Sequence, residues 1–260
     1  MTLLIIVLAL FVERVWTSLG DLRTFVWFER LADRVAGGGA GRTLSGVLGV
    51  VAVVALPLVG MIVVYALLAH ILGILGFAFA LTVVLFSLGP RDLDADVHRF
   101  LNAWELGDES KAHSYALQIN AVMTEPVETQ SLGRIAVEGI LVAAHERWFG
   151  VIFWFVILGP LGALWYRLAC VLRDKAVLRG EEDAFKDAAL TMHHILAWIP
   201  VRLTLMSYAL AGSFADTLDA LHNEDFNWKN WRANNYLLLI HGGLGALAGG
   251  EGDNPNVNRG

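Results

Sequence analysis

The stretch TLSGVLGVVAVVALPLVGMIVVYALLAHILGILGFAFALTVVLFSLGP, at positions 43–90, decides the fold because its 48 residues include no Asp, Glu, Lys or Arg. A helix needs about 20 apolar residues to cross the hydrocarbon core of a bilayer, so this run is long enough for two crossings. It divides most naturally at His70. We therefore expect membrane helices at about 44–69 and 71–88, and hence an integral membrane protein.

The composition of the whole chain agrees with this expectation. Of its 260 residues, 56% are hydrophobic and 17% are charged, whereas about a quarter are charged in ordinary soluble domains. Further membrane segments are predicted at about 2–19, 148–168 and 188–215. The segment 148–168 contains Gly159 and Pro160 and is predicted to be kinked or re-entrant. The predicted fold class is an all-α, polytopic membrane helical bundle, with residues 1–260 as a single membrane domain.

Charged residues gather between the apolar segments. Residues 91–147 are predicted to form a helical layer outside the membrane. Lys and Arg are also frequent at 20–42 and 167–186. If all three parts are cytoplasmic, as the positive-inside rule favours, the apolar segment 148–168 cannot cross fully and is re-entrant. Residues 216–260 form an acidic tail. The expected location is the cell inner membrane, crossed several times, with the lipid bilayer as the main partner.

Two of these charged parts also contain an apolar stripe on a predicted helix. In 20–42 the stripe is formed by Leu22, Phe25, Val26, Phe28 and Leu31. In 91–147 it is formed by Leu93, Val97, Phe100, Leu101 and Trp104.

Net charge and cysteine content exclude several classes of function. The net charge of -6 leaves no basic face for phosphate backbones, so nucleic acid is not an expected partner. The lone Cys170 excludes an intrachain disulfide and a cysteine metal cluster. The glycine-rich AGGGAGRT at 36–43 lacks the lysine and the preceding strand of a phosphate loop, and we interpret it as a linker. The sequence identifies no cofactor.

A candidate site lies just before the apolar segment 148–168. Glu138 and His145 are seven positions apart, so on a helix they lie on nearly the same face, and Glu146 follows directly. Such a cluster at a membrane boundary is suited to binding an anion or a metal, or to relaying protons. The alternative is a solvated helix face that ends at an interfacial Arg147.

Arg202 is the single charged residue of the segment 188–215. An ionisable group within an apolar span usually has a partner or faces a polar cavity, and Pro200 would bend the helix beside it. We predict a ligand site or polar network at Arg202; the alternative is a structural ion pair on a half-buried helix. His193 and His194 are weak metal candidates, because adjacent helical positions point in different directions.

Three blocks carry a resemblance to known proteins: SLGPRDLDADVHRFLNAWELGDESKA at 87–112, GILVAAHERWFGVIFWFVILGPLGALWYRL at 139–168 and WIPVRL at 198–203. Together they resemble the AmpE family, inner-membrane proteins of Gram-negative bacteria. This resemblance implies a membrane sensor or signalling protein linked to AmpC β-lactamase regulation and cell-wall recycling. It also implies a functional link to the amidase AmpD.

The same blocks are more remotely similar to the CobD/CbiB family, membrane enzymes that use ATP to join an aminopropanol unit to a corrinoid acid side chain. The matching positions are 91–93, 107–108, Glu138, Glu146, 153–163, Pro200 and Arg202.

The chain departs from the CobD/CbiB pattern at three places. A Gly-Arg-Asp-Thr motif is missing between residues 120 and 131. His193 and His194 replace an acidic pair, and Arg147 replaces an asparagine. Acidic groups of this kind hold magnesium with a nucleotide, so their loss argues against the unchanged synthetase reaction.

Two main hypotheses follow. The first, which the sequence favours, is a non-catalytic sensor of the AmpE type that binds a small ligand or partner in a charged pocket at the cytoplasmic surface. The second is an enzyme derived from the ATP-dependent, amide-forming synthetases, with an altered substrate. A plainer third hypothesis is a structural membrane protein that acts through helix contacts as a homodimer. The candidate ligand-binding residues are Arg91, Asp92, Asp108, Glu138, His145, Glu146, Arg147, Arg167 and Arg202.

Overall fold

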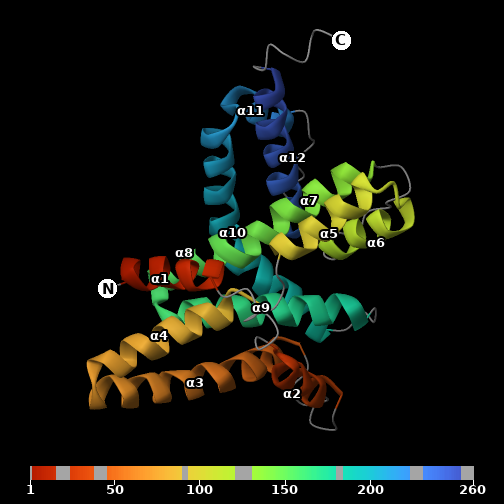
Figure 1. Ribbon diagram of the computed structural model, residues 1–260. Coiled ribbons are helices and arrows are strands. Elements are labelled where there is room, and N and C mark those ends of the chain that lie inside the picture. The colour runs from red at the N-terminus through yellow and green to blue at the C-terminus, as the bar shows by residue number, and fades with distance from the viewer. Residues whose placement is uncertain are drawn as a thin grey trace. The chain divides into compact units, whose positions relative to one another are not determined.

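The described residues fold into helices throughout. The computed structural model describes residues 2–15, 24–37, 46–89, 93–120, 131–179, 184–222 and 231–252, and every regular element among them is helical (Figure 1). Three of these helices are long and apolar enough to cross a membrane: Val47–Ile71, the continuous stretch Leu132–Leu158, and Ala184–Ala211. The prediction of an all-α membrane protein is therefore confirmed.

The chain divides into two compact units. Unit 1 contains residues Met1–Asp92 and Glu146–Leu196, and unit 2 contains Leu93–His145 and Ala197–Gly260. The single membrane domain and its membrane segments stay predictions from the sequence. The helices of unit 1 are α1 (Thr2–Val15), α2 (Val26–Gly37), α3 (Val47–Ile71), α4 (Gly73–Ser87), α8 (Gly150–Leu158), α9 (Pro160–Arg179) and the first part of α10 (Ala184–Ala211). Those of unit 2 are α5 (Leu93–Glu105), α6 (Glu109–Ile119), α7 (Leu132–Ala144), the rest of α10, α11 (Phe214–His222) and α12 (Trp231–Gly252).

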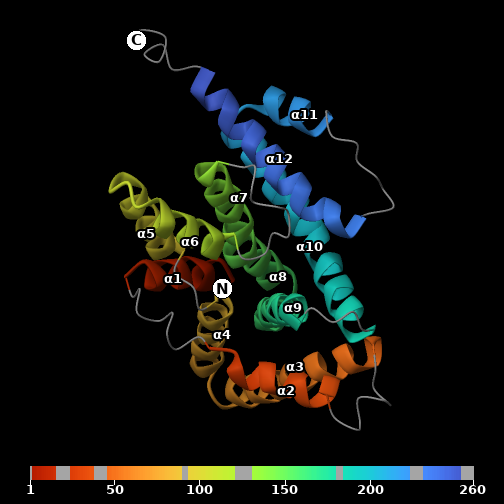
Figure 2. The same cartoon turned by 90° about the vertical axis from the view of Figure 1, so that its right-hand side faces the viewer.

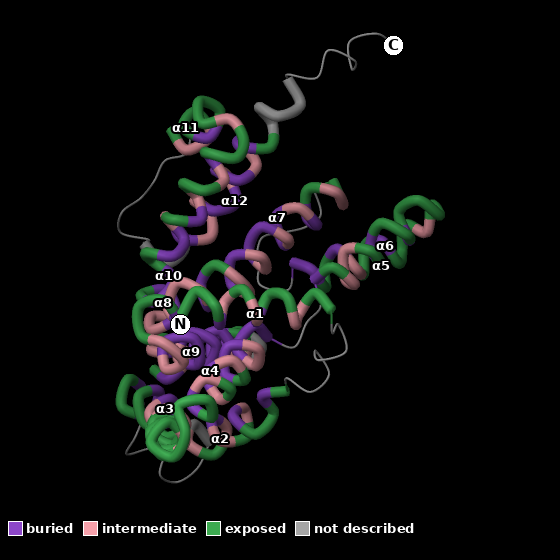
Figure 3. The backbone as a smooth tube through the Cα atoms, turned by 60° about the vertical axis from the view of Figure 1, so that its left-hand side comes forward, coloured by how far each residue is buried: buried purple, intermediate pink, exposed green. Residues whose placement is uncertain are grey.

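Helix α9 lies at the centre of unit 1. Helices α2, α3, α4 and α8 all pack against it, and α9 is mostly buried whereas much of α3 is exposed (Figure 3). Apolar side chains exposed along α3, such as Leu56, Val59 and Leu67, are suited to contact with lipid. The core of unit 1 includes Phe25, Phe28, Val50, Val53, Val54, Leu164, Leu168 and Leu172.

The amphipathic pattern predicted at 20–42 forms α2, but its buried face is narrower than expected. Phe25 and Phe28 are 4% and 0% exposed, and both belong to the core of unit 1. Val26 was predicted on the same face and is 44% exposed. In a helix of 3.6 residues per turn, adjacent positions point about 100° apart, so Val26 cannot share the direction of Phe25. Leu22 lies outside the described residues.

The apolar segment 148–168 contains a sharp break. Helix α8 ends at Gly159, whose φ of +63° lies in the left-handed region that favours glycine. Pro160 then begins α9, at the one helical position where its missing N–H costs nothing. Upstream, α7 continues through a π-helical turn, His145–Phe149, into α8. Residues 132–147, predicted as part of the extramembrane layer, therefore lie in a helix of membrane-spanning length.

Unit 2 is built around α7. Helices α5 and α6 form a hairpin, α6 and α12 pack against α7, and α11 lies on α12 (Figure 2). The stripe predicted on α5 is buried at Leu93 and Phe100, with 8% and 6% exposure, but Leu101 and Trp104 are 44% and 51% exposed. The contacts of α5 with α6 and α7 therefore bury only part of the predicted stripe.

Candidate functional site

Unit 1 buries a group of ionisable side chains in its apolar core. Arg167 and Arg173 on α9, Glu146 from the π-helical turn and His193 from α10 are all less than 10% exposed. Charged groups are almost never buried in this way unless they are paired. In an apolar helical protein, such groups mark a candidate functional site. We call Glu146, Arg167, Arg173 and His193 the α9 cluster. Contacts join Glu146, Arg173 and His193, whereas Arg167 is placed with them by its burial on the same helix.

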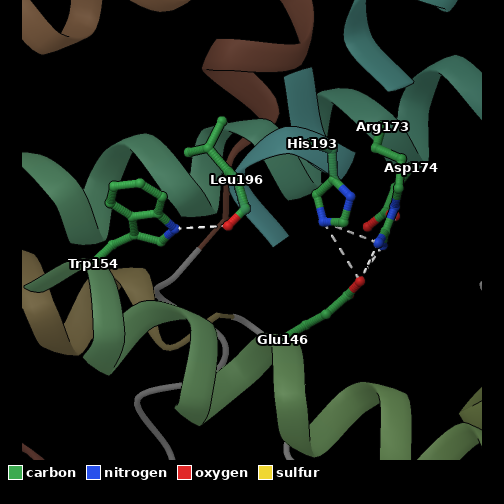
Figure 4. A network of polar contacts seen from close by, with 6 residues as sticks. All are labelled: Glu146, Trp154, Arg173, Asp174, His193 and Leu196. Carbon is green, nitrogen blue, oxygen red and sulfur yellow. Dashed lines mark hydrogen bonds and ion pairs between the residues drawn. The ribbon is translucent and has the colours of Figure 1, made fainter. Parts of the chain in front are cut away.

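The centre of the cluster is an ion pair between Glu146 and Arg173 (Figure 4). Nη1 of Arg173 donates to Oε1 of Glu146, and Nη2 donates to Oε2 at 3.0 Å. This two-pronged arrangement is the strongest geometry available to an arginine and a carboxylate. Asp174, on the same helix, also accepts from Nε of Arg173 at 2.9 Å and from Nη2 at 2.5 Å.

His193 completes the centre of the cluster. Its Nε2 lies 3.3 Å from Nη1 of Arg173 and 3.7 Å from Oε1 of Glu146. A guanidinium can only donate, so Nε2 is the acceptor in the contact with Arg173. Figure 4 shows the ring, the guanidinium and the carboxylate pointing toward one another.

Arg167 is the second arginine of the cluster and has no carboxylate partner among the described residues. Its Nε donates to the carbonyl oxygen of Ser87 at 2.5 Å. Gly89, with φ +93°, approaches so closely that a Cβ there would lie 2.6 Å from Nη2 of Arg167. The end of α4 is thus shaped around this guanidinium, and only glycine fits at position 89. Arg91 and Asp92, predicted as ligand residues in the following segment, lie outside the described residues.

The other predicted residue of unit 1, Arg147, has a different environment. It donates to Oε1 of Glu13 from Nε, at 3.1 Å, and from Nη2. It also lies beside the ring of Trp148, with 5.8 Å from Cζ to the ring centroid. This pair joins α1 to the π-helical turn, and a ligand role for Arg147 stays a prediction.

The predicted candidates of unit 2 have separate partners. Glu138 accepts from Nε of Arg134 at 2.9 Å. His145 is fully buried, and its Nδ1 lies 2.9 Å from Oγ1 of Thr204. Because that hydroxyl already donates to the carbonyl of Pro200, the Nδ1 nitrogen of His145 is the donor. Glu138 and His145 were predicted on one helix face, but each is bonded to a partner of its own.

Asp108, another predicted ligand residue, caps a helix. Its side chain accepts from the backbone N–H of Lys111 at 3.1 Å, at the start of α6, and pairs with Nζ of Lys111 at 2.7 Å. The hydrogen bond from the Lys111 side chain, and then the one from its backbone, hold the pKa of Asp108 below its ordinary value of 3.8.

This lowered pKa predicts an acid-sensitive helix start. The cap contributes its full stability above the ordinary pKa of Asp108, and this contribution is lost as the pH falls through the lowered value. We expect amide exchange in the first turn of α6, corrected for its intrinsic pH dependence, to accelerate over that range. Asp108→Asn keeps a capping side chain that does not titrate, so its exchange profile should be flat; an unchanged profile in both proteins would contradict the prediction.

The described residues contain no group of three or more His, Cys, Asp and Glu side chains arranged to hold a metal ion. The rings of His193 and His194 are 5.7 Å apart and nearly perpendicular. Within the described part of the chain, these two histidines therefore have no third ligand, and the residues present do not fit a magnesium site either.

Glu146 and Arg167 were predicted as candidates from the sequence, whereas Arg173 was not. The missed signal was spacing along α9, since Tyr166, Cys170 and Arg173 lie at i, i+4 and i+7 and share one face. Cys170, on the same face, is buried. Burial raises the pKa of its thiol to about 12, which keeps it protonated and unreactive.

Comparison with known proteins identifies the family. The family model described as CobD/Cbib protein matches residues 6–236. A relative named Cobalamin biosynthesis protein CobD, from Stutzerimonas stutzeri (strain A1501), is 28% identical over 234 residues, which cover 86% of this chain and 75% of the relative. A protein of the same name from Chromobacterium violaceum is 27% identical over 165 residues, covering 63% of this chain and 53% of that relative. No solved structure matches this chain significantly.

These matches correct the first functional hypothesis. The AmpE identity is not supported, and the predicted role in β-lactamase regulation and cell-wall signalling is wrong, because the chain matches the CobD/Cbib family and both relatives are named cobalamin biosynthesis proteins. The expected link to AmpD rested on the same resemblance. The remoter of the two resemblances was the correct one: this chain belongs to the CobD/CbiB family.

Proposed function

We propose that this protein is a membrane enzyme of the ATP-dependent, amide-forming type, in which the α9 cluster forms the reaction site. The observation that carries the proposal is the buried group of two arginines, a glutamate and a histidine within an apolar helical unit. Family membership favours this assignment over a structural role, and we place the enzyme in the inner membrane with several crossings.

The chemistry of amide formation explains why these residue types are suited to the task. ATP transfers its γ-phosphoryl group to a carboxylate and leaves as ADP. An amine then attacks the activated carbon, and phosphate leaves as the amine loses a proton. Arg167 keeps Nη1 and Nη2 free of described carboxylates, so it can bind the oxyanion of the acid or the phosphoryl group. We assign the proton to Nε2 of His193, which accepts it by giving up its contact with Arg173 and turning toward the Glu146 carboxylate.

The departures from the family pattern bear on the substrate. His193 and His194 stand where the family has an acidic pair, and Arg147 stands where it has an asparagine. Arg147 pairs with Glu13 and lies outside the α9 cluster, so the substrate argument rests on the histidines. A site with fewer carboxylates favours a more negatively charged substrate. We therefore propose an acid or amine partner altered from the corrinoid acid and aminopropanol of the family.

Purified protein in detergent provides the test. ATP consumption should depend on adding both a corrinoid acid or related carboxylic acid and an amino alcohol or its phosphate ester. Glu146→Gln keeps the volume of the side chain but removes its charge, and should lower the turnover rate by about a hundredfold. Arg167→Lys should mainly raise the KM for the anionic substrate, because a lysine cannot reproduce a planar two-pronged contact.

The control is Arg30→Ala, which removes an exposed charge from α2 in the same unit and should leave turnover unchanged. Equal losses of turnover in Arg30→Ala and Glu146→Gln would contradict a specific reaction site at the α9 cluster. Turnover of the wild-type protein that survives Glu146→Gln and Arg167→Lys would place the reaction elsewhere and overturn the proposal.

A further inference from the structure

Arg202 is a second unusual arginine, and it belongs to unit 2, whereas the α9 cluster belongs to unit 1. It stands nine residues before the end of α10, about 14 Å along the helix axis. Its neighbours on that helix include Leu203 and Met206, which are 46% and 60% exposed. The guanidinium therefore sits within an apolar helix surface, where an uncompensated charge is costly.

Three contacts fix the orientation of this guanidinium. Nη1 donates to the carbonyl oxygen of Trp198 at 2.7 Å and to Oδ1 of Asn235 at 3.2 Å. Its Cζ lies 3.9 Å from the centroid of the Trp198 ring, which supports one face of the charged plane. Asn235, on α12, is fully buried, so the position of its amide oxygen is fixed by the packing of that helix.

The opposite edge of the same guanidinium is available. Both hydrogen bonds of Arg202 use Nη1, and no described residue accepts a hydrogen bond from Nε or Nη2. Arg134, Arg147 and Arg173 each pair with a carboxylate, whereas among the described residues Arg202 has none. Nε and Nη2 together form the parallel pair of donors that matches two oxygens of a carboxylate or phosphate.

We propose that Arg202, held by Trp198 and Asn235, is an oxyanion-binding site that takes a phosphate or carboxylate group on its Nε and Nη2 edge. The side chain of Asn235 is a neutral amide, so it orients the guanidinium of Arg202 without neutralising its charge. The phosphate can belong to a soluble molecule or to a lipid headgroup, since the recognition chemistry is the same. This proposal goes beyond the proposed enzymatic function, because it concerns a different unit and does not depend on turnover.

Asn235→Asp is the most informative variant. The change is nearly isosteric and supplies an internal carboxylate to Arg202, so the protein should remain folded with an equal or higher Tm. Binding of inorganic phosphate, measured by calorimetry in detergent, should weaken by about tenfold or more, because the charge is already neutralised. Arg202→Ala should weaken the binding of phosphate by a similar factor. Arg99→Ala removes an exposed charge on α5 and serves as the matched control, with binding unchanged.

A second arm distinguishes the source of the phosphate. The same proteins are reconstituted in nanodiscs of phosphatidylcholine with or without phosphatidylglycerol, and bound lipid is measured by native mass spectrometry. Retention of phosphatidylglycerol by the wild type but not by Asn235→Asp identifies a lipid headgroup, whereas phosphate binding without lipid retention identifies a soluble ligand. If neither ligand distinguishes the wild type from Asn235→Asp, or if Arg99→Ala loses binding equally, the proposal is wrong. None of these results depends on the turnover assay of the α9 cluster.

Discussion

Replacing Arg173 with methionine should lower the free energy of unfolding by about 3–5 kcal/mol, because it leaves a buried carboxylate without its partner. Arg173 is 2% exposed and holds both oxygens of Glu146, whose side chain is 10% exposed. Methionine fills most of the same volume, so the loss is mainly electrostatic. The expected observation is a large drop in the Tm of the detergent-purified protein, followed by loss of helical circular dichroism.

The double variant Arg173→Met, Glu146→Leu separates the ion pair from simple packing. Removing both charges together should restore much of the stability, since an apolar pair can replace a buried ion pair at little cost. Its turnover should nevertheless be absent if the α9 cluster is the reaction site. A double variant as unstable as Arg173→Met would show that the charges are not the cause of the loss.

Phe28→Ala should also lower the free energy of unfolding by about 3–5 kcal/mol, because it opens a cavity in the core of unit 1. Phe28 is fully buried and belongs to the core cluster that α2 forms with α3 and α9. The surrounding helices are held by many other contacts, so they can close only part of the space. Thermal unfolding in detergent measures this loss directly.

The neighbouring Trp27 provides a matched control. Trp27 is larger than Phe28 but is 47% exposed, so Trp27→Ala should cost about 1 kcal/mol or less. Equal losses of stability in the two variants would contradict the orientation of α2. A larger loss for Trp27 would show that the helix presents its opposite face to the core.

The membrane class and helical fold could be predicted from sequence because they depend on composition alone. A run of 48 residues without Asp, Glu, Lys or Arg has few alternatives to membrane helices. The stripes on α2 and α5 were predicted with the correct period but with too great a width, as Val26, Leu101 and Trp104 show. How much of a stripe is buried depends on the size of the partner surface, which a periodicity cannot reveal.

The candidate site was only partly accessible from sequence. Glu146 and Arg167 stood out because they lie next to an apolar segment. Arg173 did not, because it stands among other charged residues, Asp174 and Lys175, and reads as part of a solvated face. Lys175 does pair with Asp33 of α2 at 2.6 Å, while Arg173, two positions earlier, turns toward the core.

The sequence by itself determined that this protein is a helical membrane protein, and it carried the resemblance to the CobD/CbiB family that the family match confirmed. Only the tertiary structure decided which charges are buried together, because Glu146, Arg173 and His193 are brought into contact by the packing of separate helices. It also decided that Arg147 pairs with Glu13, which is 134 positions away. Burial and pairing depend on distances between elements, and local sequence patterns encode only distances within one element.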